Sequence, residues 1–175
     1  LLERKIYNYE LTALGEEAAI GGLGPVEKQE TELDGYIGFS TFNIFLKYEI
    51  ERIKNSGKTS SAGSLSLKTP VALSSSIGVK YNTVVGEVAE FIKNATLATD
   101  ILTFINNNTF LIISPDNDKF RLESLLNNIR HSVQKLIDSN IDEANIIVKI
   151  KADNINSTKS HNDLLNSLLT NNGTD

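Results

Sequence analysis

The chain has 175 residues, a length that suits one domain plus some flanking sequence. Its net charge of −5 argues against nucleic acid as a partner, because the phosphate backbone attracts basic surfaces. There is no cysteine, which excludes disulfides and thiolate metal sites, and no apolar run approaches the ~20 residues of a membrane span. There is no methionine either, and we expect a piece of a longer cytoplasmic protein whose upstream part could carry a membrane anchor.

Residues 1–33 are predicted to form an N-terminal helix followed by a glycine- and proline-containing linker. Leu2, Ile6, Tyr9 and Ala13 recur at helical spacing. The pattern fits an amphipathic lead-in helix, or the end of a coiled-coil helix through which the protein would form a homodimer. The glycines around Pro25 match neither a Walker loop nor a dinucleotide fingerprint, so we expect no phosphate site there.

A helix, a strand and a second helix are predicted next. Ser40 is the expected N-cap of the first helix and Gly57 ends it. The strand is expected between Gly63 and Leu73, followed by a loop over 74–80 and a helix capped by Asn82. The apolar stripes of the two helices are Phe42, Phe45, Leu46, Ile50 and Ile53, and then Val84, Val85, Val88, Ala89, Ile92 and Ala95.

A β-hairpin is predicted at about 100–113, in the middle of the chain. Its two arms are rich in β-branched and aromatic residues, and three asparagines join them. Asparagine takes the positive φ of a tight turn more easily than other non-glycine residues. We therefore interpret Asn106, Asn107 and Asn108 as the turn.

A long helix, a strand and a short helix complete the domain. Residues 115–118 supply N-cap candidates, the strand is expected over Asn145 to Ala152, and the last helix over His161 to Leu169. The apolar face of the long helix is Phe120, Leu122, Leu125, Leu126, Ile129, Val133, Leu136 and Ile137. The order predicts an α/β (α+β sandwich) domain over 34–170, with a mixed sheet, a central hairpin, covering helices and a disordered tail at 171–175.

This order and its spacing resemble the GGDEF domain, the diguanylate cyclase module of bacterial signalling proteins, whose sheet is a ferredoxin-like palm. Asp34 and Gly38 are identical to the family's opening Asp-x-Leu-Thr-Gly-Leu-x-Asn-Arg. Asp100 occupies the first position of Asp-x-x-x-Arg-x-Gly-Gly-Asp-Glu-Phe, and Phe104 replaces its arginine. The signature itself is replaced by Asn106, Asn107, Asn108, Thr109 and Phe110, of which only the phenylalanine matches.

The resemblance implies a site that has lost its chemistry. Joining two GTP molecules into cyclic di-GMP needs metal ions, and in the family their carboxylate ligands come from the first strand and from the third signature letter. That letter is Asn108 here, and no Asp or Glu lies between Glu51 and Glu87, so no alignment puts a carboxylate on the strand. We predict no enzymatic activity, no catalytic residues, no cofactor and no metal site.

The family's inhibitory Arg-x-x-Asp site is also incomplete. Leu97 replaces the arginine that would hold guanine and phosphate, while Asp100 is retained. Binding of cyclic di-GMP in that mode is therefore doubtful. Asp100 has an ordinary alternative role at the start of a strand or in a turn.

Five basic residues lie in the stretch without acids: Arg52, Lys54, Lys58, Lys68 and Lys80. Lys68 and Lys80, together with Ser74, Ser75 and Ser76, are predicted as an anion or partner surface, the alternative being solvated lysines. His131 and His161 lack metal-ligand spacing, and His131 is predicted to be a surface or boundary residue.

We expect an inactive GGDEF-like domain that acts as a regulatory or protein-interaction module in a larger bacterial signalling protein. Its partners would be other domains of the same protein or a separate protein. The alternative is a receptor that still binds GTP or cyclic di-GMP weakly in the vestigial cleft.

Overall fold

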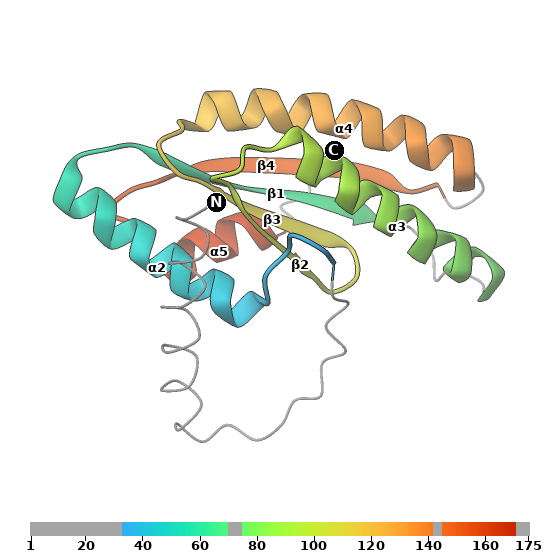
Figure 1. Ribbon diagram of the computed structural model, residues 1–175, viewed down its shortest axis with the longest axis horizontal. Coiled ribbons are helices and arrows are strands. Elements are labelled where there is room, and N and C mark those ends of the chain that lie inside the picture. The colour runs from blue at the N-terminus through green and yellow to red at the C-terminus, as the bar shows by residue number, and fades with distance from the viewer. Residues whose placement is uncertain (1–32, 70–74, 142–144, 171–175) are drawn as a thin grey trace, which may run out of the picture. The chain divides into compact units, whose positions relative to one another are not determined.

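The computed structural model describes residues 33–69, 75–141 and 145–170 (Figure 1). The predicted N-terminal helix and linker, Ser74 and the tail at 171–175 lie outside this part of the chain. The elements follow the predicted order: α2 (Phe39–Ser56), β1 (Ser60–Lys68), α3 (Ser75–Ala95), β2 (Ile101–Ile105), β3 (Thr109–Ser114), α4 (Lys119–Ile141), β4 (Ile147–Ile155) and α5 (His161–Leu169). No helix in these ranges is long and apolar enough to span a membrane.

The four strands form one sheet in the order β2-β3-β1-β4. Every neighbouring pair is antiparallel, so the sheet is not mixed as expected. The helix α3 connects β1 with β2, which run in the same direction, but β3 lies between them. In the same way β1 separates β3 from β4, so no two parallel strands are in contact. The hairpin is central in the chain but lateral in the sheet, because β2 is an edge strand.

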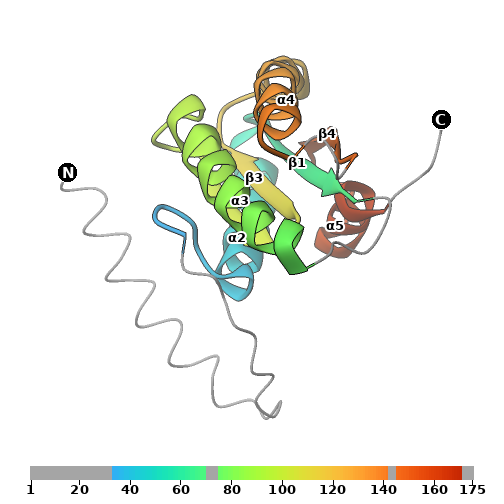
Figure 2. The ribbon, with the colours of Figure 1, turned by 90° about the vertical axis from the view of Figure 1, so that its right-hand side faces the viewer.

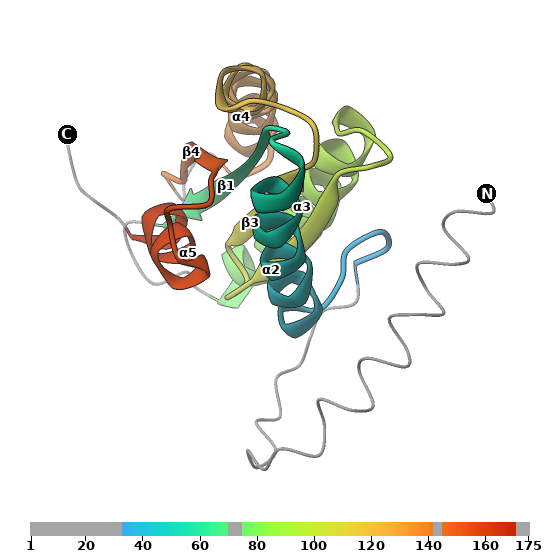
Figure 3. The same ribbon diagram turned by 90° about the vertical axis from the view of Figure 1, so that its left-hand side faces the viewer.

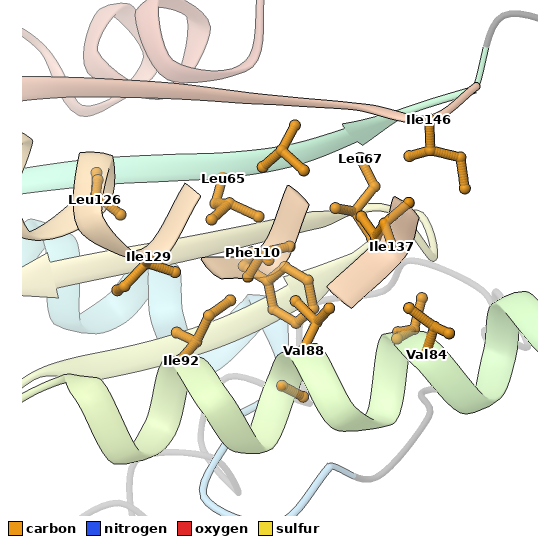
Figure 4. Close-up of a cluster of buried hydrophobic side chains, with 14 of the residues drawn as sticks. Leu65, Leu67, Val84, Val88, Ile92, Phe110, Leu126, Ile129, Ile137 and Ile146 are labelled. Atoms are coloured by element: carbon orange, nitrogen blue, oxygen red, sulfur yellow. The ribbon is translucent and has the colours of Figure 1, made fainter. Parts of the chain in front are cut away.

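Helices cover both faces of the sheet, which confirms the predicted α+β class. On one face, α3 and α4 enclose a core with Leu65 and Leu67 of β1 and Phe110 of β3 (Figure 4). On the other face, α2 and α5 pack on Ala62, Leu111 and Ile113 (Figure 3). Adjacent strand residues alternate between the two cores, as the twofold period of a strand requires.

Local sequence explains several helix ends. Gly57 follows α2 with φ 65°, a left-handed conformation that glycine adopts without steric cost. Asp118 accepts a hydrogen bond from the backbone N–H of Arg121 (2.9 Å) at the start of α4. Ser160 accepts one from the N–H of Asp163 (3.1 Å), which caps α5.

Two predicted helix starts are wrong. Gly38, not Ser40, is the N-cap of α2, and no side chain caps that end. The helix α3 begins at Ser75, so that residues 75–80 are helical and Asn82 lies within the helix. The early start lets Tyr81 pack into the core, a tertiary gain that outweighs the weak helix propensity of the serines.

The strand β1 begins earlier than predicted, at Ser60, and passes closely under α4. A Cβ atom at Gly63 would lie 2.7 Å from Cδ1 of Leu126, so this glycine allows the helix to approach the sheet. Most of the predicted apolar face of α4 is buried. Leu125 and Leu136 are partly buried, and Phe120, in the first turn, is 78% exposed.

Both edges of the sheet are partly closed. At the β2 edge, the N–H of Ile37 donates to the carbonyl of Leu102 (2.9 Å) and the hydroxyl of Thr103 donates to the carbonyl of Ile37 (2.7 Å). At the β4 edge, the side-chain amide of Gln134 donates to the carbonyl of Ile146 (2.9 Å) and accepts from the N–H of Val148 (3.0 Å). The Gln134 amide thus replaces a neighbouring strand at this end of β4.

Candidate functional site

The three-asparagine turn between β2 and β3 has the predicted geometry. Asn106 and Asn107 have φ values of 53° and 55°, and the N–H of Asn108 donates to the carbonyl of Ile105 (3.3 Å). Positive φ at both central positions characterises the type I′ turn, whose twist matches that of the flanking strands. The asparagines therefore satisfy the backbone requirement that glycines would otherwise meet.

The carbonyl groups of the turn are held by β1 and α3. The N–H of Leu67 donates to the carbonyl of Asn108 (2.8 Å), and the hydroxyl of Tyr81 donates to the carbonyl of Asn107 (2.9 Å). Burial raises the pKa of Tyr81 to about 12, so the hydroxyl stays protonated and remains a donor at neutral pH. The turn is thus fixed to the end of β1 by the backbone and to α3 by a side chain.

A chain of neutral side chains joins the end of β1 to the turn. The hydroxyls of Ser66 and Thr109 lie 3.2 Å apart, and the Thr109 hydroxyl donates to Oδ1 of Asn108 (2.9 Å). Asn108 stands at the third signature position, where the resemblance implies a metal-binding carboxylate, and Ser66 lies near the end of β1, the strand expected to supply another. Their oxygens are neutral, whereas Mg²⁺ is bound mainly through carboxylates and phosphates. Within the described ranges, no three acidic, histidine or cysteine side chains form a group that could hold a metal ion.

Three lysines share the sheet face on which Ser66 lies. In the strand register Lys149 is opposite Ser66, Lys151 is opposite Ser64, and Lys68 is two residues beyond Ser66 on β1. Burial lowers the pKa of Lys68, and the charges of Lys149 and Lys151 lower it further. We call this group of Lys68, Lys149 and Lys151 the lysine face. Its positive charge makes the neighbourhood of the turn unfavourable for a divalent cation.

The lysine face differs from the surface that the sequence predicts. Lys80 is exposed on α3, which covers the opposite face of the sheet, so it does not lie on the lysine face with Lys68. Ser75 and Ser76 form the start of α3, and Ser74 is outside the described residues. Lys149 and Lys151 were missed, because their neighbourhood with Lys68 depends on the pairing of β1 with β4. The alternation of lysines with Val148 and Ile150 was the signal in the sequence.

The other basic residues of the stretch without acids are in ion pairs. Arg52 contacts Glu49 (2.6 Å) and Asp116 (3.0 Å), and Asp116 also lies 3.5 Å from Lys58. Lys54 pairs with Glu51 (2.6 Å). These contacts connect the end of α2 with the turn before α4 and leave little free positive charge there.

Asp100 organises the turn that leads into β2. One carboxylate oxygen accepts from the backbone N–H of Leu97 (2.8 Å) and the other from the hydroxyl of Ser114 (2.7 Å). Burial raises the pKa of Asp100, while these two hydrogen bonds act in the opposite direction. The side chain of Leu97 is 61% exposed and provides no hydrogen-bonding group for a ligand.

Phe110, the retained letter of the signature, is completely buried under α3 and α4 (Figure 4). Its ring centroid lies 4.5 Å from that of Phe104 and 5.8 Å from that of Tyr36. Phe104 stands where the resemblance expects arginine, so an aromatic contact replaces a charged group. The aromatic cluster supports the hairpin from within the core.

The architecture is that of GGDEF domains, as the resemblance implies. The GGDEF domain of DgcB from Caulobacter crescentus in complex with c-di-GMP has a TM-score of 0.61 at 16% identity, covering 84% of this chain and 88% of that chain. The GGDEF domain of FimX from Pseudomonas aeruginosa has a TM-score of 0.64 at 13% identity, covering 81% and 89%. The diguanylate cyclase SiaD from the same organism, in complex with its activator SiaC, has a TM-score of 0.58 at 12% identity, covering 95% of this chain and 64% of that chain.

No protein-family model and no curated protein matches the sequence. The likeness to the solved structures is therefore one of fold. The residues of the site carry the argument about function.

Proposed function

We propose that this domain is a catalytically inactive GGDEF-fold domain that regulates a cyclic di-GMP signalling protein through protein contacts in the cytoplasm. The observation that carries the proposal is the neutral chain of Ser66, Thr109 and Asn108 at the junction of β1 and the hairpin turn. Joining two GTP molecules is phosphoryl transfer, which depends on positioning and on metal ions that neutralise the phosphates.

The residues present do not fit a magnesium ion. The whole of β1 lacks a carboxylate, and the turn offers only amide side chains. The nearest charged groups on that face are those of Lys68 and Lys149. A cation placed there would meet like charge and no anionic ligand, so we derive no catalytic step through a metal.

The link to cyclic di-GMP signalling comes from the fold. SiaD, a diguanylate cyclase, forms a complex with the activator SiaC, so a GGDEF-fold protein can be a partner in a protein complex. The GGDEF domain of DgcB forms a complex with c-di-GMP. The present domain lacks the charged side chains that would bind metal and nucleotide, and this favours contact with a protein over binding of c-di-GMP.

Two measurements on the purified domain test the proposal. Incubation with GTP and Mg²⁺, followed by chromatography, should yield neither cyclic di-GMP nor GDP above a protein-free control. Titration calorimetry with GTP and with cyclic di-GMP, each with Mg²⁺, should give no binding heat at high micromolar ligand. Clear product would refute inactivity, and saturable heat without product would replace our proposal by that of a nucleotide receptor.

A further inference from the structure

Part of the sheet face beside the hairpin turn is uncovered in the described structure. The helix α5 ends over the middle of this face, where the hydroxyl of Ser64 donates to the carbonyl of Leu168 (2.9 Å). Lys151 donates to the carbonyls of Ser167 (3.1 Å) and Thr170, so it holds the helix end in place. Neither α2 nor α5 extends to the end of the sheet where β1 ends and β4 begins (Figure 1). Figure 2 views the domain from this end.

An exposed apolar side chain accompanies the lysines on this uncovered part. Ile147 is the register partner of Lys68 and is 55% exposed. On β4, Ile147, Lys149 and Lys151 alternate with residues that face the other core. The surface therefore combines an accessible apolar group with positive charge, since Lys68 lies opposite Ile147 and Lys149 is two residues further along β4.

Within the described ranges, the charges of Lys68 and Lys149 have no acidic partner, whereas Lys151 binds the carbonyls at the end of α5. The chain as a whole is acidic, with a net charge of −5. Among the residues that the structure describes, no carboxylate forms an ion pair with Lys68, Lys149 or Lys151. The acid on the same strand face, Asp153, is paired with Lys159. A positive surface on an acidic protein is complementary to an acidic partner and orients it.

We propose that the lysine face, with Ile147, is a docking surface for an acidic, partly apolar segment of a partner protein. The inference rests on the proposed regulatory function and deepens it by naming the chemistry of the partner. A protein segment suits the surface better than a free phosphate, because a phosphate would leave the apolar side chain in water. Acidic side chains would meet Lys68 and Lys149, and apolar ones would cover Ile147.

The test is binding of a fluorescent peptide in which glutamate and leucine alternate, followed by anisotropy. We expect saturable binding that weakens as salt rises from 50 to 300 mM, because surface ion pairs are screened. Lys149→Gln should weaken binding about two- to fivefold, the loss expected for one exposed charge pair. The matched control is Lys135→Gln, since Lys135 is an exposed lysine on α4 over the other face, and it should leave binding unchanged.

A second pair of variants tests the apolar part. Ile147→Ser should weaken binding, whereas Phe120→Ser, at another exposed apolar residue, should not. The proposal is overturned if Lys149→Gln and Lys135→Gln behave alike, or if a lysine version of the peptide binds equally well. Binding to phosphatidylserine vesicles without binding to the peptide would also overturn it, in favour of a membrane surface.

These results are independent of the catalytic question. Turnover of GTP would refute the proposed inactivity and leave the peptide measurements valid. Equal peptide binding by the two glutamine variants would refute the docking surface and leave the inactivity standing.

Discussion

Replacing Asn106 and Asn107 by alanine should destabilise the domain, whereas replacing them by glycine should not. Both residues are in the left-handed region, at φ 53° and 55°. An ordinary side chain there costs roughly 1–2 kcal/mol per residue, and asparagine avoids part of this cost through local hydrogen bonds. We expect the double alanine variant to lose about 2 kcal/mol, which lowers Tm by roughly 4–8 °C in a protein of this size.

The double glycine variant should stay within about 1 kcal/mol of the wild type, because relief of strain offsets the larger entropy of the unfolded glycine chain. It also restores the two glycines of the signature, and it should still produce no cyclic di-GMP.

Thermal unfolding followed by circular dichroism measures the stabilities of the variants. Chromatography after incubation with GTP tests the glycine variant for cyclic di-GMP. Asn128→Ala is the matched control. Asn128 is exposed on α4, where alanine should stabilise the helix by up to about 0.7 kcal/mol. The same substitution should therefore stabilise the domain in the helix and destabilise it in the turn. An alanine turn as stable as the wild type would refute the reasoning about the turn. Cyclic di-GMP from the glycine variant would show that turn geometry, not missing charge, prevents catalysis.

Phe110→Ala should cost about 3–5 kcal/mol in urea unfolding because it empties a fully buried site, and a loss below about 1 kcal/mol would contradict the packing described. The double variant Ser66→Asp, Asn108→Asp should bind Mn²⁺ measurably in calorimetry, because it provides two carboxylates at the junction of β1 and the turn. The single variant Asn108→Asp should not bind Mn²⁺ measurably. Equal affinity of the two variants would mean that the carboxylate on the strand is dispensable. Gln134→Ala should lower the free energy of unfolding by about 1 kcal/mol, because it leaves the N–H of Val148 at the β4 edge without its partner. The exposed edge should also increase self-association in sedimentation. A variant that stays monomeric and equally stable would show that the amide is not needed.

The hairpin and α5 could be predicted because local signals and tertiary packing agree there. The asparagines predict a turn because asparagine adopts positive φ more easily than other non-glycine residues, and Asn106 and Asn107 have positive φ. Ser160 caps the start of α5 with its side chain. The start of α3 could not be predicted in this way. Residues 74–80 contain serines and a glycine that favour a loop, and only the contacts of Tyr81 with the core and with Asn107 explain the longer helix.

Only part of the composition of the candidate site could be predicted from the sequence. The absence of carboxylates on β1 and in the turn is a property of the sequence, and no strand pairing can change it. The lysine face depends on which strand lies beside β1. Lys68 and Lys149 are 81 positions apart in the chain, and only the register of β1 with β4 makes them neighbours.

The two partly closed edges of the sheet affect how a partner can associate. With Ile37 beside β2 and Gln134 beside β4, strand addition must first break existing hydrogen bonds at those positions. Contact through side chains on an open face needs no such step, so encounter can be fast and controlled by ionic strength. Because few groups are desolvated, the complex would also dissociate readily. The fraction of the domain in complex would then follow changes in the concentration of its partner.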